Sequence, residues 1–245
     1  MKKILIILLF ILHEFHSFAD DKIFLAVTSP WPPFEYTENE ENVGTDVEII
    51  KQAFKRMNKK IIIMSFRWKT CLEMIKNNKA DAIFSLRKTK QRENFLIFPD
   101  EVLNKSENVF FKKKENDHKY SGKLIDLKGL TIGVTKGYDY GNEFMNSKLF
   151  KLNYSNRDIT GFKKVDRGTV DLFICDKLVG LFQLKKNKIR KIDFIPFIYS
   201  KFDMYLAFAK KKNYNIIVKE FEKALKSLKE DQTYNKILNK YTGAY

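Results

Sequence analysis

Residues 45–85 read TDVEIIKQAFKRMNKKIIIMSFRWKTCLEMIKNNKADAIFS, and this stretch decides the fold. Its first segment, 45–58, places apolar side chains on one face of a helix, as expected of an amphipathic helix that covers a sheet. Thr45 and Glu48 have the spacing of a capping box, which favours a helix start at this threonine. The apolar face consists of Val47, Ile50, Phe54 and Met57.

Two short strands and a second helix complete the stretch. Residues 61–65 and 81–85 are apolar runs of strand length, and residues 69–76 between them predict a short helix. Toward the N-terminus, residues 23–28 form another apolar run, which ends in the rigid segment Ser29-Pro30-Trp31-Pro32-Pro33. The order is therefore β-α-β-α-β, which is typical of a mostly parallel sheet covered by helices.

The same pattern restarts further along the chain, after a Lys-rich stretch. No Gly/Ser-rich linker or repeat separates the two halves. We therefore expect two α/β lobes that are joined by strands, with a cleft at the strand ends. The later elements are expected at 130–134 (strand), 136–137 (turn), 140–146 (helix), 170–175 (strand), 176–185 (helix) and 204–209 (strand), followed by two helices.

Residues 1–19 have the pattern of a secretory signal. Two lysines precede an apolar run at 4–12, and Ala19 ends a small-residue cleavage site. We expect an exported mature chain that begins near Asp20. No later segment of about 20 residues lacks charge, so no membrane span is expected. Retention of the signal as an uncleaved anchor is the alternative.

The charge balance is strongly basic, with 46 Lys and Arg against 30 Asp and Glu and a formal net charge of +16. Such a balance can indicate binding to nucleic acid or to an anionic surface. However, most of the basic residues are lysines, and they are spread over most segments of the chain. The sequence also contains no aromatic motif of the kind found in RNA-binding proteins. We therefore interpret the charge as a solvated lysine surface and expect no nucleic-acid partner.

Cysteine and histidine usage narrows the chemistry. Cys71 and Cys175 lie in apolar elements and are expected to be separate buried thiols, with pairing in an oxidising compartment as the alternative. His13 and His16 belong to the signal, and His118 lies in a Lys-rich loop. Neither a His-based catalytic triad nor a His metal site is expected in the mature chain, and no cofactor is expected.

Seven groups of short motifs resemble, in order and spacing, those of the extracellular solute-binding proteins of the polar amino-acid type, family 3, the binding components of ABC importers. Each motif is weak alone, but together they span nearly the whole mature chain. They are Pro32–Tyr36 (PPFEY), Gly44–Glu48 (GTDVE), Trp68 before a helix, Asn78–Ile83 (NKADAI), Thr89–Arg92 (TKQR), Leu127–Gly129 (LKG) with Ile132–Gly137 (IGVTKG), and Arg167–Asp171 (RGTVD) with Asp176.

The resemblance implies an α/β, bilobal periplasmic-binding-protein fold of type II, in which the chain forms lobe one, crosses to lobe two and returns. It places lobe one at 20–107 plus 203–245 and lobe two at 108–202, with hinge strands near 108–112 and 199–204. It also implies that a small polar ligand, an amino acid or related compound, is captured in the cleft and delivered to an ABC permease in the membrane. We expect a monomer in the periplasm or otherwise outside the cell.

A ligand site follows from the same resemblance, and side-chain chemistry agrees with it. Arg92 stands where the family binds the ligand carboxylate, and a guanidinium offers two parallel donors to two oxygens. A surface arginine in a charged turn is the alternative. Thr89, three residues earlier, would add a bond through its hydroxyl or backbone. Asp176 stands where the family binds the ligand ammonium, and the alternative is that it caps the helix that follows.

Aromatic residues are candidates to enclose the side chain of the ligand. Trp31, Phe34 and Trp68 offer broad apolar contact and a cation-attracting face, with core packing as the alternative for each. Trp31, between two prolines, is the one most expected to face the cleft.

Three further candidates, Ser85, Arg87 and Tyr138, lie where the chain departs from common amino-acid binders. Tyr138 and Asp139 follow a glycine where small hydroxyl residues are usual, and the segment 86–88 replaces small polar residues. These departures predict a pocket unlike the common one, in which Arg87 extends the site toward an acidic or larger ligand.

Two rival functions remain open. One is a dehydratase of the cyclohexadienyl type on the same fold, with carboxylates and Arg92 as acid and anion clamp. Product formation from prephenate or arogenate would support it. The other is an extracellular sensor, which would need a separate signalling partner, because we expect no signalling domain in this chain.

Overall fold

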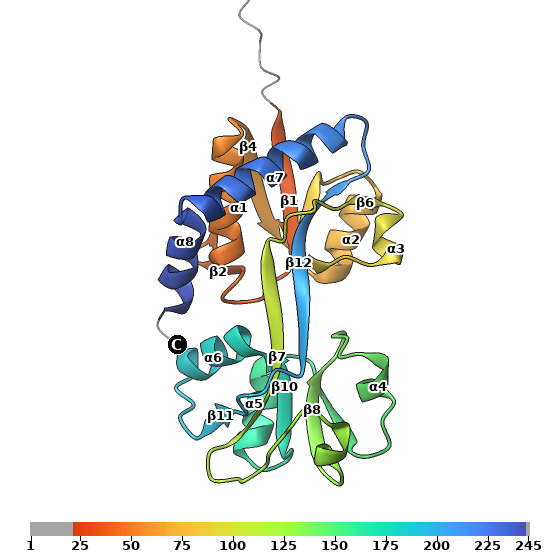
Figure 1. Ribbon diagram of the computed structural model, residues 1–245, viewed down its shortest axis with the longest axis vertical. Coiled ribbons are helices and arrows are strands. Elements are labelled where there is room, and N and C mark those ends of the chain that lie inside the picture. Colours follow the sequence, from red (N-terminus) through yellow and green to blue (C-terminus); the bar gives the residue numbers. More distant parts are fainter. Residues whose placement is uncertain (1–21, 244–245) are drawn as a thin grey trace, which may run out of the picture.

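The computed structural model describes residues 22–243, so the predicted signal at 1–19 lies outside the described part. Figure 1 shows two bodies of helices and strands that two long strands connect. The upper body is called the first lobe below, and the lower body the second lobe. The first lobe contains β1 (Ile23–Thr28), β2 (Tyr36–Glu38), β3 (Glu41–Val43), α1 (Thr45–Arg56), β4 (Lys60–Ser65), α2 (Trp68–Lys76), β5 (Ala82–Arg87), α3 (Lys90–Glu93), β6 (Leu96–Ile97), α7 (Tyr214–Glu230) and α8 (Thr233–Thr242).

The second lobe lies between the two connecting strands in the sequence. Those strands are β7 (Asn104–Lys113) and β12 (Ser200–Ala209). The second lobe itself contains the 3-10 helix η1 (Leu124–Leu127), β8 (Thr131–Thr135), α4 (Asn142–Met145), β9 (Lys151–Ser155), α5 (Asp158–Asp166), β10 (Leu172–Asp176), α6 (Lys177–Lys186) and β11 (Ile192–Phe194).

Within the described residues the strands form one curled sheet with the order β4-β1-β5-β12-β7-β10-β8-β9, with β11 beside β7 and β6 beside β12. In the first lobe β1 pairs in parallel with β4 and β5, and in the second lobe β8 pairs in parallel with β9 and β10. This confirms the mixed α/β architecture expected from the β-α-β pattern. Separately, β2 and β3 form a small antiparallel hairpin.

The connecting strands β7 and β12 are antiparallel to each other and continue into both lobes (Figure 1). Their shared register runs from Ser200 opposite Asn108 to Met204 opposite Asn104. The predicted lobe limits, 107/108 and 202/203, fall inside this paired segment and stay predictions. Among residues 22–243, β12 and β7 are the strands that connect the two halves of the sheet, which is the arrangement of a hinge.

Each lobe has apolar layers on both sides of its part of the sheet. In the first lobe, α1, α7 and α8 cover one face through residues such as Phe54 and Phe221, and α2 covers the other through Cys71. In the second lobe, Phe144 and Phe173 belong to two separate clusters. Both cysteines are free and buried in different lobes, which confirms the expectation of separate thiols. Within residues 22–243, no helix has the length and apolar character needed to cross a membrane.

The start of α1 differs from the sequence expectation. Its N-cap is Gly44, with no side-chain cap hydrogen bond, so the capping box of Thr45 and Glu48 does not form. Thr45 is fully buried instead, and its Oγ1 donates to Asp46 Oδ1 at 3.3 Å. The preceding loop satisfies the first amides of the helix instead, since the amides of Thr45 and Asp46 donate to the backbone oxygens of Pro33 and Phe34 at 3.1 and 3.0 Å.

Candidate functional site

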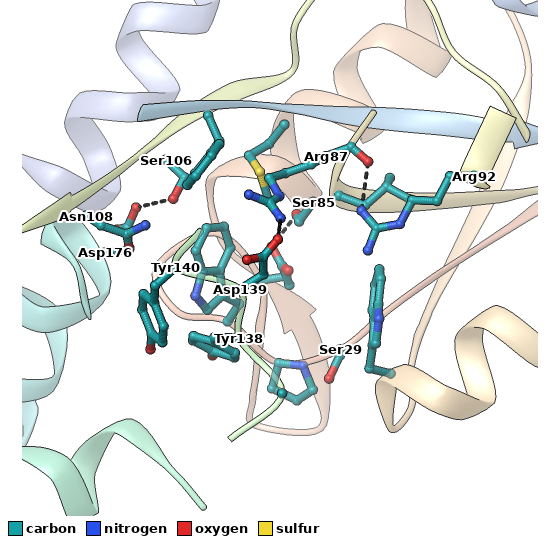
Figure 2. A pocket seen from close by; sticks show the side chains of 18 residues that line it. Ser29, Ser85, Arg87, Arg92, Ser106, Asn108, Tyr138, Asp139, Tyr140 and Asp176 are labelled. Atoms are coloured by element: carbon teal, nitrogen blue, oxygen red, sulfur yellow. Dashed lines mark hydrogen bonds and ion pairs between the residues drawn. The ribbon is translucent and has the colours of Figure 1, made fainter. Parts of the chain in front are cut away.

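A cavity of about 240 Å³ lies between the lobes, beside the crossing strands (Figure 2). The parallel strands β1, β5, β8 and β10 all end at this place, as ligand sites of α/β sheets do. Residues of both lobes and of β7 and β12 line it. Seven of the nine candidates named from the sequence are among them: Trp31, Trp68, Ser85, Arg87, Arg92, Tyr138 and Asp176.

Two candidates, Phe34 and Thr89, do not line the cavity. Phe34 is 1% exposed and packs in a cluster with Phe111 and Phe162 of the second lobe. Thr89 is the N-cap of α3, and its Oγ1 accepts from the Arg92 amide at 3.3 Å. Neither side chain lines the cavity, and their contact with a ligand stays a prediction. Phe34 packs in the core, and Thr89 positions the backbone of Arg92.

Arg92 presents its guanidinium to the cavity from α3. One nitrogen, Nη1, donates to the backbone oxygen of Arg87 at 2.7 Å, and the guanidinium carbon lies 5.6 Å from the ring centroid of Trp68. Within the described residues no carboxylate forms an ion pair with it. Burial, and then the charge of Arg87, lower the pKa of Arg92 from its ordinary value. A half-buried cation without an acidic partner is ready to take an anion.

Arg87 ends β5 and forms an ion pair with Asp139 of the second lobe. Its guanidinium also lies over the ring of Phe202 on β12, 4.2 Å from the centroid. Figure 2 shows the Asp139 carboxylate among the lining side chains, facing Arg87. The pair therefore spans the cleft, from the first lobe to the second.

Asp176 is the N-cap of α6, as one of the two readings of the sequence expected. Its Oδ1 accepts from the amides of Leu178 and Val179, at 2.9 and 3.1 Å. Its Oδ2 accepts from Ser106 Oγ at 2.9 Å and from the Glu107 amide at 3.0 Å. The side chain is buried, and this burial raises the pKa of Asp176 to about 6. Contact between Asp176 and a ligand stays a prediction.

Ser85, in the left-handed region with φ 57°, joins two buried carboxyl groups at the floor of the cavity. Its Oγ lies 2.7 Å from Glu35 Oε2 and 2.7 Å from Asp46 Oδ2. A hydroxyl has one hydrogen to donate, so one carboxyl must carry a proton for both contacts to be hydrogen bonds. Burial raises the pKa of Asp46 to about 7, and burial with the nearby Asp46 charge raises the pKa of Glu35 well above its ordinary value.

Aromatic rings form the walls. Trp31 stacks on Phe34 with centroids 4.5 Å apart, so its outer face is left for the cavity. Trp68 begins α2, and Tyr138 stands in the turn after β8, with its hydroxyl 3.4 Å from Asp158. The arrangement suits a small molecule with an anionic group near Arg92 and a body between aromatic rings. Among residues 22–243 no group of three or more His, Cys, Asp and Glu side chains is placed to hold a metal ion.

Sequence reasoning left eleven of the lining residues off its candidate set, among them the polar residues Glu35, Ser106 and Asp139. Glu35 belongs to the PPFEY motif, and Asp139 directly follows the candidate Tyr138. The sequence therefore contained a signal for both residues. Ser106 carried no signal, because only the crossing of β7 beside β10 brings it to Asp176.

Comparison with known proteins gives relatives over nearly the whole chain. The probable amino-acid-binding protein YxeM of Bacillus subtilis is 25% identical over 228 residues, which cover 91% of this chain and 84% of that protein. The arginine-binding periplasmic protein of Mannheimia haemolytica is 26% identical over 252 residues, with 99% of each chain covered.

Among solved structures, the arginine-, lysine-, histidine-binding protein ArtJ of Geobacillus stearothermophilus has a TM-score of 0.72 at 22% identity, with 91% of this chain and 96% of that chain covered. This likeness shows the fold, which is that of the type II periplasmic binding proteins. The family model described as bacterial extracellular solute-binding proteins, family 3, matches residues 23–244, and the chain belongs to this family.

Proposed function

We propose that this chain captures a small polar ligand, an amino acid or a related compound with a carboxylate, in the cavity between its lobes and delivers it to an ABC importer. The observation that carries the proposal is the guanidinium of Arg92, which is half-buried, rests against Trp68 and has no acidic partner among residues 22–243. Named relatives bind arginine or other amino acids, which supports a ligand of this class.

The proposal includes location and assembly. The mature protein is exported after cleavage near Ala19, acts as a monomer in the periplasm or otherwise outside the cell, and meets its permease in the membrane. Its lobes are 20–107 with 203–245 and 108–202, and they close on the ligand about β7 and β12. The family and the named relatives are binding proteins, and we propose capture without a chemical step.

A ligand that binds only the folded chain raises its melting temperature. The test is therefore a thermal-shift screen of the twenty amino acids, small amines and dicarboxylates, followed by calorimetry of each hit. Loss of a charge-assisted contact costs about 1.5–3 kcal/mol, so Arg92→Ala should weaken the hit on the order of 10- to 100-fold.

The matched control is Arg190→Ala, because Arg190 is exposed in the loop after α6, away from the cavity. It should bind as the wild type does. A hit that persists unchanged in Arg92→Ala would show that the ligand binds elsewhere. No hit at millimolar concentration, together with no co-purified ligand in native mass spectrometry, would contradict the proposal.

A further inference from the structure

Two guanidinium groups face the cavity, whereas the carboxylate of a simple amino acid needs only one of them. Arg92 on α3 is the proposed partner of that carboxylate, and Arg87 at the end of β5 is left over. Among residues 22–243, these two are the basic residues that line the cavity. The group that Arg87 meets on the ligand therefore affects which ligands bind.

Arg87 is held in place and partly removed from water. Its side chain is 26% exposed, and its guanidinium lies over the ring of Phe202, 4.2 Å from the centroid. Its backbone oxygen accepts from Arg92 Nη1 at 2.7 Å, so the two arginines are neighbours. Burial, and then the charge of Arg87, lower the pKa of Arg92, which shows that the two cations repel each other. Two neighbouring cations are stabilised best by two negative groups.

The negative charge beside Arg87 comes from Asp139 of the second lobe. Figure 2 shows this carboxylate among the lining side chains, facing Arg87, so it stands where an anionic group of a ligand can stand. Its Oδ1 accepts from the Gly141 amide at 2.9 Å, and this bond, followed by Arg87, lowers the pKa of Asp139. The Asp139 side chain is 62% exposed, so water can solvate it when the ion pair opens.

The two members of this ion pair differ in what its opening costs. An anionic group of a ligand takes the place of Asp139 on Arg87, and Asp139 turns to water. A cationic group of a ligand would bind Asp139 and leave Arg87 without a partner, partly buried and beside Arg92. The second exchange costs more, because a partly desolvated charge loses its compensating charge. The difference in exposure therefore favours a ligand with a second anionic group.

We propose that the ligand carries two acidic groups, as aspartate and glutamate do, and that Arg92 binds one of them while Arg87 binds the other in the place of Asp139. Asp139 is then a competing group within the cavity, which the second carboxylate of the ligand displaces. The ammonium is left to Asp176. With Asp176 ionised, Arg87, Arg92 and Asp176 carry one net positive charge, which complements the one net negative charge of an acidic amino acid. This inference rests on the proposed function and deepens it.

Isothermal titration calorimetry at neutral pH tests the preference with glutamate against glutamine and aspartate against asparagine. The members of each pair have nearly the same shape and differ in the second carboxylate. The wild type should bind the better of the two acids at least about tenfold more tightly than its amide, since a charged partner strengthens the contact with Arg87. Arginine, whose side chain is cationic, should bind less tightly than that acid.

Arg87→Gln tests the source of the preference. Affinity for the acid should fall at least about tenfold, and affinity for the amide should change by less than about threefold. The matched control is Lys88→Gln, which removes the same charge one residue further along. The Lys88 side chain is 45% exposed and pairs with Glu93, and neither residue lines the cavity. This control should keep the wild-type affinities.

Asp139→Asn tests the competition. Affinity for the acid should rise at least about threefold, by more than affinity for the amide, because the ligand no longer has to displace a carboxylate. Damage to the fold cannot produce such a gain. The control is Asp117→Asn, since the Asp117 side chain is 89% exposed in a loop of the second lobe outside the cavity. Its affinities should equal those of the wild type.

Three results would overturn the inference while the proposed function stands. The first is a wild type whose tightest ligand carries a single acidic group, such as an amide or arginine. The second is a preference for the acid that survives in Arg87→Gln, and the third is an unchanged or lower affinity for the acid in Asp139→Asn. If no amino acid, amine or dicarboxylate binds the wild type, the proposed function fails and the inference fails with it.

Discussion

At the scale of single residues, the shared proton of Glu35 and Asp46 ties stability to pH. The pKa of Asp46 is raised from 3.8 to about 7, while an unfolded chain would release this proton near pH 4. Between these values the native chain holds a proton that the unfolded chain has lost. The free energy of unfolding should therefore fall as pH rises from about 4 to 7, with a slope of up to about 1.4 kcal/mol per pH unit for each proton.

Urea unfolding between pH 5 and 8 measures this slope, and Glu35→Gln tests its cause. The glutamine removes one of the two carboxyl groups that compete for the Ser85 hydroxyl, so Asp46 can ionise more easily. The slope should become shallower. Asp117→Asn, on the exposed loop, should keep the wild-type slope, and an equally steep slope in Glu35→Gln would contradict the shared proton.

Seven of the eighteen residues that line the cavity could be predicted from the sequence, but the hydrogen bonds and charge of each could not. Arg92 and Trp68 were found because their motifs place them after β5 and at the start of α2. Asp139 was recognised only as a departure from the common pattern, because its partner Arg87 lies in the other lobe, and two of the four hydrogen bonds to Asp176 come from β7. Such contacts join residues about 70 positions apart, which no local pattern reports.

At the scale of elements, the loop before α1 requires glycine at its N-cap. Gly44 has φ +126°, and a Cβ there would lie 2.3 Å from the Phe34 carbonyl oxygen. Gly129 also has positive φ, +81°, but a Cβ would meet nothing within 4 Å. Substitution at Gly129 therefore introduces backbone strain alone, whereas substitution at Gly44 adds a steric clash with the Phe34 backbone.

Gly44→Ala should lower the free energy of unfolding by about 3 kcal/mol or more, since it combines strain with a backbone clash. Gly129→Ala should cost only about 1–2 kcal/mol, the strain of a left-handed residue. Urea denaturation of both variants provides the comparison. An equal decrease in the free energy of unfolding for both variants would show that the loop at Phe34 can move to accommodate a Cβ at position 44 without further cost.

The elements that sequence patterns predicted are those with a clear apolar face. Helix α1 was expected at 45–58 and observed at Thr45–Arg56, and β1 was placed at its observed ends. In contrast, β9 reads KLNYS with one buried residue at its end, so no alternation marked it. This polar edge strand is placed by its parallel pairing with β8, a contact between separate elements that the local sequence does not show.

At the scale of the whole molecule, aromatic contacts outside the ligand site also hold the two lobes together. The ring of Tyr36 on β2 lies 5.3 Å from the ring of Phe182 on α6, and Trp31 and Phe34 pack against second-lobe residues. These contacts join the two lobes outside the polar part of the cavity. Opening the cleft about β7 and β12 separates them, so they stabilise only the closed form.

Removing one such contact should therefore weaken ligand binding without touching a binding residue. An aromatic pair contributes about 0.5–1.5 kcal/mol, so Phe182→Ala should lower ligand affinity by about two- to tenfold. The cause is a shift toward the open form, which reduces the binding-competent fraction. Calorimetry measures the affinity, and small-angle X-ray scattering should show a larger radius of gyration for the ligand-free variant.

Phe197→Ala is the matched control, because Phe197 is 40% exposed and packs on Tyr120 within the second lobe. It should leave both affinity and radius unchanged. If Phe182→Ala keeps the wild-type affinity and radius, the Arg87–Asp139 pair and the ligand alone determine closure. If it weakens affinity at an unchanged radius, Phe182 acts on the cavity itself, since population of the open form is then the same in both proteins.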